Sequence, residues 1–213
     1  MKINKPNFNK RVLMICLISI IAILACGIGY AVQSDSIAKM FGKQQAEVLS
    51  NAGDGIVATV DGEKITKKGF DTYKLFLNNS GKEVSDQQVL DKIVDRQLIY
   101  KQAIKENVVV SDQEVANAIK MAQDTIRSDS KQYEAFKEYI SGLNMSEDEY
   151  WKSVEPVYKK ALTCGKYKNT LKENFKKDNK IEDQSELNSK FEEFYSKTVK
   201  ELKGKVEVKS NLK

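Results

Sequence analysis

Hydrophobic residues follow three patterns along this chain, and each pattern predicts a different kind of element. Residues 12–32 form one apolar run that carries no charge. Residues 56–60 are rich in β-branched side chains and end at an Asp-Gly pair, which predicts a strand followed by a turn. Beyond Thr66, apolar residues return every three or four positions, as in amphipathic helices. We therefore expect a mainly helical body behind one N-terminal apolar segment.

Three Ser-x-x-Glu/Gln motifs indicate where helices start. In this capping box the serine hydroxyl accepts a hydrogen bond from the backbone N–H three residues later, and the Glu or Gln side chain bonds back to the serine N–H. Three pairs have this spacing: Ser85 with Gln88, Ser111 with Glu114, and Ser146 with Glu149. Further helices are expected after Thr66, over residues 133–142 and over residues 187–202.

The helix that begins at Ser146 is expected to be the longest, running past residue 175. It carries an apolar stripe at helical spacing, which should face the core. The stripe contains Tyr150, Val154, Val157, Ala161 and Leu162. Pro156 lies inside this helix and should kink it, because proline lacks the N–H that the helix needs. Residues 176–185 are charged and poor in apolar side chains, so we expect a surface connection there.

The end of the chain predicts a second strand. Residues 205–208 alternate polar and apolar, which is the period of a half-buried strand. A terminal strand needs a partner for its backbone N–H and C=O groups. The other clear strand is residues 56–60, so we expect a small two-stranded sheet that pairs residues near 56–60 with residues 205–208. This sheet would close the helical domain.

The N-terminal apolar run has the length of a membrane anchor. Its 21 residues would span about 31 Å as a helix, close to the ~30 Å hydrocarbon core of a bilayer. Four basic residues precede it, which predicts a cytoplasmic N-terminus. We therefore divide the chain into four parts: a basic cytoplasmic segment (1–11), a transmembrane signal anchor (12–32), a tether with a short helix around residues 37–49 (33–55), and an extracytoplasmic domain (56–213).

Two alternatives for the N-terminal segment use the same residues. The sequence around Cys26, Ile-Leu-Ala-Cys-Gly, is similar to a bacterial lipobox, in which Cys26 would be lipidated. Gly29 and Ala31 form a small-x-small pattern that is typical of a cleavage site for secretion. Retention, lipidation and cleavage all predict that the body lies outside the cytoplasmic membrane.

The composition argues against an enzyme. The chain has no histidine, which excludes Ser-His-Asp and Cys-His nucleophiles and His-ligated zinc or haem sites. The common glycine-rich phosphate-binding motifs are also absent. Without the four basic residues of the N-terminal segment, 31 basic and 30 acidic side chains remain, so no nucleic-acid-binding charge excess is left. Cys164 is the one cysteine outside the apolar run, which rules out a disulfide within the body. We expect no catalytic site, no metal and no cofactor.

Several motifs, in order, resemble the SurA/PrsA family of extracytoplasmic chaperones. Residues 56–66, IVATVDGEKIT, are similar to the strand and turn that open the chaperone core of that family. Residues 89–99, VLDKIVDRQLI, and then residues 109–115, VVSDQEV, are similar to its next helix and the cap that follows. Residues 202–208, LKGKVEV, resemble the strand that completes the core. The resemblance implies a helical SurA N-terminal-like domain over residues 56–213.

The resemblance also implies a function. Many members insert a parvulin-type prolyl isomerase domain before the closing helix, and such domains carry active-site histidines. Here residues 176–185 stand in that place, so isomerase activity is not expected. The resemblance implies a membrane-anchored holdase that binds unfolded or newly exported polypeptides, with no nucleic-acid or small-molecule partner. Two alternative functions remain open: a dedicated partner-binding subunit of an envelope complex, and an enzyme that uses carboxylates alone.

Aromatic side chains are the candidates for contact with such polypeptides. The candidates are Phe70, Tyr73, Phe76, Tyr133, Phe136, Tyr139, Tyr150 and Trp151. We expect most of them to belong to the core. Tyr150 and Trp151 are adjacent on a helix, so we expect one of these two to be exposed.

Overall fold

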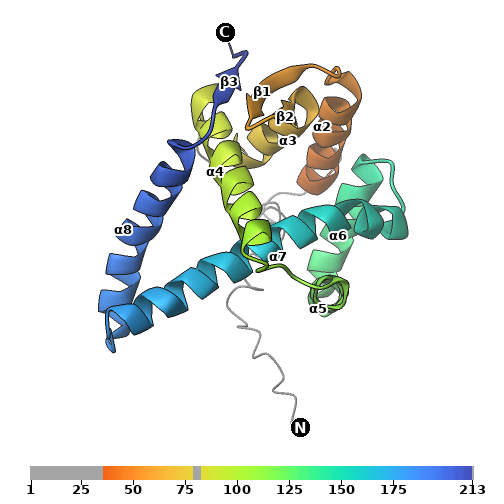
Figure 1. Cartoon of the computed structure of the whole chain (residues 1–213). Helices are drawn as coiled ribbons and strands as arrows, with labels where there is room; N and C mark the ends of the chain where they lie inside the picture. Colours follow the sequence, from red (N-terminus) through yellow and green to blue (C-terminus); the bar gives the residue numbers. More distant parts are fainter. Residues whose placement is uncertain (1–35, 79–82, 213) are drawn as a thin grey trace.

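The computed structural model describes residues 36–78 and 83–212, which form seven helices and three short strands (Figure 1). The elements in chain order are α2 (Ile37–Asn51), β1 (Ile56–Val60), β2 (Glu63–Thr66), α3 (Lys67–Asn78), α4 (Asp86–Lys105), α5 (Asp112–Arg127), α6 (Ser130–Gly142), α7 (Glu147–Asp178), α8 (Gln184–Lys203) and β3 (Val208–Ser210). The expected mainly helical fold is confirmed.

The helix starts lie where the capping motifs predict them. Ser85, Ser111 and Ser146 each precede a helix, and each forms both hydrogen bonds of the capping box. Thr66 caps α3, because its Oγ1 accepts from the Gly69 N–H at 3.1 Å. These four local signals therefore set the beginnings of α3, α4, α5 and α7.

The two ends of the domain pair as expected, but the sheet has three strands rather than two. Its order is β2-β1-β3, with both pairs antiparallel. Strand β2 was not expected from the sequence. Asp61 and Gly62 both have positive φ, 48° and 79°, which is the backbone of a two-residue hairpin turn. That turn returns the chain along β1, so that Val60 pairs with Glu63.

The C-terminal strand lies later than predicted, at Val208–Ser210 instead of residues 205–208. The N–H groups of Lys205 and Val206 bond back to Leu202 and Lys203, which continues the end of α8 as a turn. The first backbone hydrogen bond between this end of the chain and the sheet region is therefore made at Glu207, whose carbonyl accepts from the Asp61 N–H at 3.1 Å. Val208 then pairs with Val60, and Ser210 with Ala58.

The expected helix near residues 37–49 is present as α2, but it does not belong to a tether. This helix packs along α6, and Phe41 is buried in the same core as Tyr139. Their rings stack with centroids 5.8 Å apart. The expectation of a tether over residues 33–55 is therefore wrong for α2, which contributes to the hydrophobic core.

The long helix α7 contributes to two hydrophobic cores. Its first turns belong to the core of α2, α5 and α6, and Tyr167 further along is buried with Ile99 and Ala103 of α4 in a smaller core beside α8. The sheet, α3 and α4 enclose a separate core. Helix α7 is continuous through Pro156 and runs on to Asp178. The connection to α8 is therefore shorter than predicted, and it is pinned by the buried side chain of Ile181.

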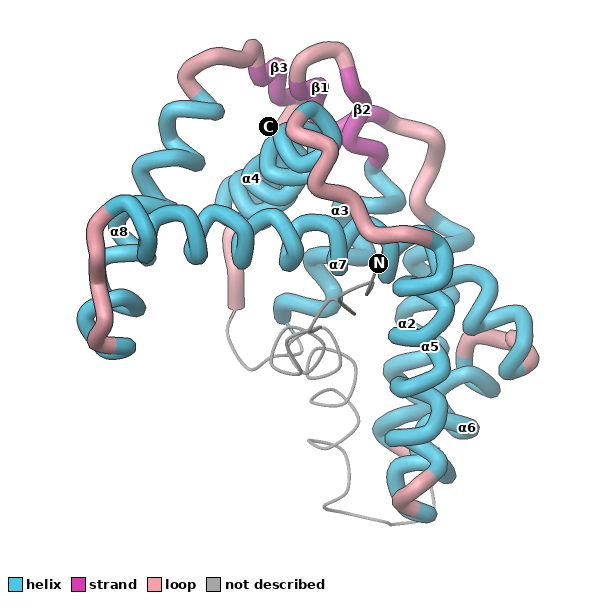
Figure 2. Tube along the Cα trace, turned by 60° about the horizontal axis from the view of Figure 1, so that its bottom comes forward, coloured by secondary structure: helices cyan, strands magenta, loops and turns pink. Residues whose placement is uncertain are grey.

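Helix α8 returns from the far end of α7 to the sheet, so that α4, α7 and α8 form a frame (Figure 1). Two ion pairs hold the end of α8 on α4: Lys203 Nζ lies 3.1 Å from Asp91 and 2.9 Å from Asp95. Figure 2 shows the three strands together, with α8 on the opposite side of the molecule from α2, α5 and α6. This return of α8 brings β3 beside β1.

Within residues 36–78 and 83–212, no helix has the length and hydrophobicity needed to cross a membrane. The expected anchor over residues 12–32, with Cys26, lies outside the described residues.

Candidate functional site

Most of the aromatic candidates belong to the core, as expected. Five of the eight are buried: Phe70, Phe136, Tyr139, Tyr150 and Trp151. The other three are half-buried against the same cores: Tyr73, Phe76 and Tyr133. The structure brings Phe136, Tyr139, Tyr150 and Trp151 into one cluster, with centroid separations from 5.2 to 5.8 Å.

The expectation that Tyr150 or Trp151 is exposed is wrong. Both side chains are buried, at 4% and 5% exposure. The reason is that the first turns of α7 contact both α5 and α6, so two directions around this helix face protein. The Trp151 Nε1–H donates to Glu147 at 3.3 Å, which satisfies its polar group. Burial raises the pKa of the Tyr150 hydroxyl well above its usual value.

Only part of the predicted stripe of α7 faces the core. Tyr150 and Leu162 are buried, together with Tyr158, which lay outside the stripe. Val154 and Ala161 are half-buried, and Val157 is 60% exposed, more than any other large hydrophobic side chain in the described part of the chain. Because α7 crosses α4 rather than lying along it, a stripe with helical spacing does not stay in contact with one neighbour.

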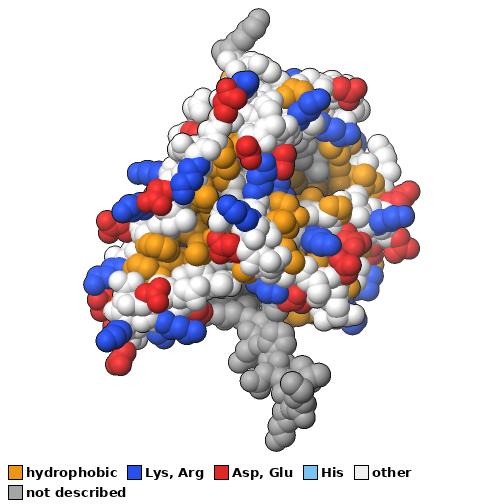
Figure 3. All heavy atoms as spheres, viewed as in Figure 1, with side chains coloured by type: hydrophobic (Ala, Val, Ile, Leu, Met, Phe, Trp, Pro, Cys, Tyr) orange, Lys and Arg blue, Asp and Glu red, His pale blue; other side chains and the backbone are white. Residues whose placement is uncertain are grey.

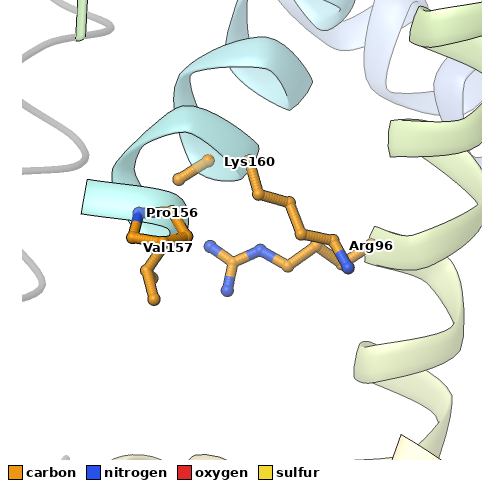
Figure 4. Close-up of a pocket in the computed structure, with 5 residues that line it drawn as sticks. Arg96, Pro156, Val157 and Lys160 are labelled. Atoms are coloured by element: carbon orange, nitrogen blue, oxygen red, sulfur yellow. The ribbon is translucent and has the colours of Figure 1, made fainter. Parts of the chain in front are cut away.

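A hollow opens beside this crossing (Figure 4). It has a volume of about 260 Å³ and is lined by Arg96 of α4 and by Pro156, Val157, Lys160 and Ala161 of α7. Its walls are mainly apolar, and the two basic side chains reach into it from opposite helices. Hydrophobic side chains also gather along α8 and beside α4 on the face drawn in Figure 3.

The crossing itself is fixed by packing and by two polar contacts. Ile99, Ala103 and Tyr167 are buried together where α4 meets α7. The Cys164 thiol donates to the Arg96 carbonyl at 3.7 Å, and the Tyr167 hydroxyl donates to Glu106 at 2.8 Å. The hollow lies on the N-terminal side of the buried contacts along both helices, between Arg96 of α4 and Lys160 of α7.

Aromatic rings hold the two basic side chains at the hollow. The Arg96 guanidinium lies over the Tyr73 ring, 5.9 Å from its centroid, and Lys160 Nζ lies over the Tyr100 ring at 5.2 Å. The ring faces attract cations without neutralising them. In the described part of the chain, neither Arg96 nor Lys160 has a carboxylate within ion-pair distance.

The charge of Lys160 acts on one acidic side chain outside the hollow, Glu63. It is already engaged by two other groups: Gln97 donates to one carboxylate oxygen, and Lys101 Nζ lies 3.3 Å from the other. Partial burial opposes ionisation, but these hydrogen bonds and the charges of Lys101 and Lys160 lower the pKa of Glu63 on balance. Glu63 is thus ionised at neutral pH and is shared mainly between Gln97 and Lys101.

A second hollow of about 510 Å³ lies between α2 and α3. Lys67 in its lining pairs with Asp71 at 2.6 Å, which leaves the negative charge of Glu47. It therefore lacks the positive charge excess of the hollow at Arg96 and Lys160.

Nothing in the described residues provides a metal centre. No group of three or more Cys, Asp or Glu side chains there is placed to hold a metal ion. Cys164 packs, half-buried, with the side chains at the junction of α4, α7 and α8.

The hollow and one aromatic cluster were not among the sites expected from the sequence. These aromatic residues join the C-terminal half of α7 to α8: Phe175 stacks on Phe194 at 4.8 Å, and Lys168 lies over the Tyr195 ring at 4.4 Å. Phe191 is fully buried among them, and the other rings are half-buried. A signal for this cluster was present, since Phe191, Phe194 and Tyr195 have helical spacing. No comparable signal marks Arg96 and Lys160, which meet only because two helices cross.

Comparisons with known proteins identify one family. A search among curated proteins found no significant match, and a comparison with solved structures found none either. The model of the SurA-like N-terminal domain family matches residues 6–157, more than two thirds of the chain. The matched part contains the sheet hairpin, α2 to α6 and the first turns of α7. This chain therefore belongs to the family of SurA-like N-terminal domains.

Proposed function

We propose that this protein is a membrane-anchored extracytoplasmic chaperone of the holdase type, which binds unfolded or newly exported polypeptides without isomerising their prolyl bonds. The observation that carries the proposal is the family match over residues 6–157. It agrees with the order of the motifs in the sequence, from the opening strand to the closing one.

The hollow beside α4 supports binding by contact alone. Val157 and Pro156 are exposed there, and covering them would remove apolar surface from water, worth about 25 cal/mol per Å². The volume of about 260 Å³ lies below the usual ~300–1,000 Å³ of small-molecule pockets. A site of this size suits one or two side chains of a longer chain that continues over the surface.

The location follows from the N-terminal sequence. Basic residues precede an uncharged apolar run of 21 residues, an arrangement typical of a signal anchor with its N-terminus in the cytoplasm. In this proposal the helical body lies outside the membrane, where newly exported chains emerge.

The absence of isomerase activity follows from composition. The chain contains no histidine, and the parvulin-type domains of the resembled family depend on histidines. The connection between α7 and α8, residues 179–183, stands where those relatives insert that domain.

The test uses the full chain in lipid nanodiscs, with empty nanodiscs as the control. A chemically unfolded client protein is diluted into the sample, and its aggregation is followed by light scattering. We expect the chain to suppress aggregation in proportion to its concentration, and we expect no acceleration of prolyl isomerisation in a proline-limited refolding assay. If aggregation is unchanged and the chain instead forms a stoichiometric complex with one envelope protein, the alternative of a dedicated partner-binding subunit replaces the proposal.

A further inference from the structure

Arg96 and Lys160 differ from three basic residues close to them at the α4–α7 crossing, which are neutralised. Lys101 pairs with Asp61 and Glu63, and Lys159 pairs with Asp112 at 2.7 Å. Lys166, next to Tyr167 in the crossing, pairs with Glu114 at 3.2 Å. The lining of the hollow, by contrast, holds two positive side chains and no carboxylate.

The position of the two cations concentrates their charge at one place. Figure 4 shows Arg96 extending from α4 toward Pro156 and Val157, and Lys160 extending from α7 toward α4. Two like charges that face one hollow repel each other, and a bound anion would relieve this repulsion. The guanidinium group is also suited to bind a carboxylate through two parallel hydrogen bonds.

From this arrangement we infer that the hollow binds client segments in which an apolar side chain lies next to an acidic one. The apolar side chain would cover Val157, Pro156 and Ala161, and the carboxylate would bind Arg96 and Lys160. This inference rests on the proposed function and adds a charge preference to it.

The apolar wall favours a polypeptide over a simple anion. A phosphate or a nucleic-acid backbone would use the two charges but would leave Val157 exposed. The body as a whole carries almost no excess positive charge, so no extended basic surface continues from the hollow. An acidic side chain beside an apolar one satisfies both parts of the lining.

The experiment measures binding of short fluorescent peptides to the full chain in nanodiscs by fluorescence anisotropy. One peptide alternates Leu with Asp, the second replaces Asp by Asn, and the third replaces Asp by Lys. We expect the Leu/Asp peptide to bind about fivefold more tightly than the Leu/Asn peptide, since two exposed ion pairs contribute modestly. Raising the salt concentration should reduce this preference, and inorganic phosphate should compete only weakly.

Charge variants of the chain test whether Arg96 and Lys160 cause the preference for the acidic peptide. The double variant Arg96→Gln/Lys160→Gln should lose the preference for the Leu/Asp peptide, and Arg96→Glu/Lys160→Glu should prefer the Leu/Lys peptide. The matched control is Lys131→Gln/Lys197→Gln, which removes the same charge at two exposed positions on α6 and α8. This control should retain the preference.

The outcomes separate the inference from the proposed function. If the chain suppresses aggregation but binds all three peptides equally, or if the Gln double variant behaves like its control, the charge preference is wrong and the holdase function stands. If the Leu/Asp preference depends on Arg96 and Lys160 but aggregation is not suppressed, the charge preference of the hollow stands and the holdase function is wrong. Competition by phosphate as strong as by the peptide would overturn the assignment to a polypeptide.

Discussion

Gly42 of α2 and Gly142 of α6 lie face to face, and each occupies the space that a side chain at the other would need. A Cβ built on Gly142 would lie 2.3 Å from the Lys39 carbonyl oxygen and 3.0 Å from the Gly42 Cα. A Cβ on Gly42 would lie 2.2 Å from the Tyr139 carbonyl oxygen. These contacts are with backbone atoms, which cannot rotate away. The pair thus allows α2 and α6 to approach closely and joins α2 to the core.

Replacing Gly142 by alanine should therefore destabilise the protein, although alanine is the better helix former by about 1 kcal/mol. The clash with the backbone of α2 should outweigh this gain and lower the free energy of unfolding by about 2 kcal/mol. Urea unfolding followed by circular dichroism measures the effect. Gly53→Ala is the control, because a Cβ at Gly53 has no atom within 4 Å and its stability should change little. Equal stability of the two variants would contradict the close approach of α2 and α6.

Ending the chain at Val206 should destabilise the sheet. The truncation removes β3, and with it the Glu207 carbonyl that accepts from the Asp61 N–H. It also removes Leu212, which packs half-buried against the core of the sheet. We expect a lower melting temperature and faster hydrogen exchange at the Asp61 amide, measured by NMR. Lys209→Ala keeps the strand and changes only an exposed side chain, so its exchange should match that of the parent chain.

The features that the sequence predicted are those set by a few neighbouring residues. The capping boxes at Ser85, Ser111 and Ser146 fix helix starts because all their partners lie within three residues. The pairing of the two ends was predictable because β1 needed a partner and few candidates existed. β2 was missed because it holds only four residues, and only Ile65 among them is buried. The hollow could not be predicted, since Arg96 and Lys160 are 64 positions apart and meet through the angle of two helices.

Glu147 links the start of α7 to α5 and α6. Its carboxylate accepts hydrogen bonds from Arg127 at 2.7 Å, from the Tyr133 hydroxyl at 3.0 Å and from Trp151. Partial burial opposes ionisation, but these hydrogen bonds lower the pKa of Glu147 on balance below its ordinary value of 4.5. A carboxyl group whose pKa is lower in the folded state contributes stability above its unfolded pKa. That contribution is lost as the pH falls through the folded pKa.

Glu147→Gln should therefore be less stable than the parent chain at pH 7, and this difference should shrink as the pH falls below 4.5. Comparing the variant with the parent at each pH cancels the other acidic groups, which both proteins share. Thermal unfolding between about pH 3 and pH 7 measures the difference. Glu193→Gln removes an exposed carboxylate on α8 and should change stability by less than about 0.5 kcal/mol at either pH. If the stability difference between Glu147→Gln and the parent chain is the same at every pH in this range, the Glu147 carboxylate does not stabilise the protein through its ionisation.

Trp151 and Val157 lie less than two turns apart on α7, yet we expect the substitution of Trp151 to change stability and that of Val157 to change peptide binding. Trp151 is buried against Phe136, with ring centroids 5.4 Å apart, so Trp151→Ala should cost about 3–5 kcal/mol of stability. Val157 is 60% exposed at the hollow, so Val157→Ser should leave stability within about 0.5 kcal/mol. The same Val157→Ser chain should bind both the Leu/Asp and the Leu/Asn peptide more weakly, because it removes apolar contact rather than charge. Unchanged affinity of Val157→Ser for both peptides would mean that clients do not cover Val157. A folded, stable Trp151→Ala variant with weakened peptide binding would indicate that clients bind at the aromatic cluster instead.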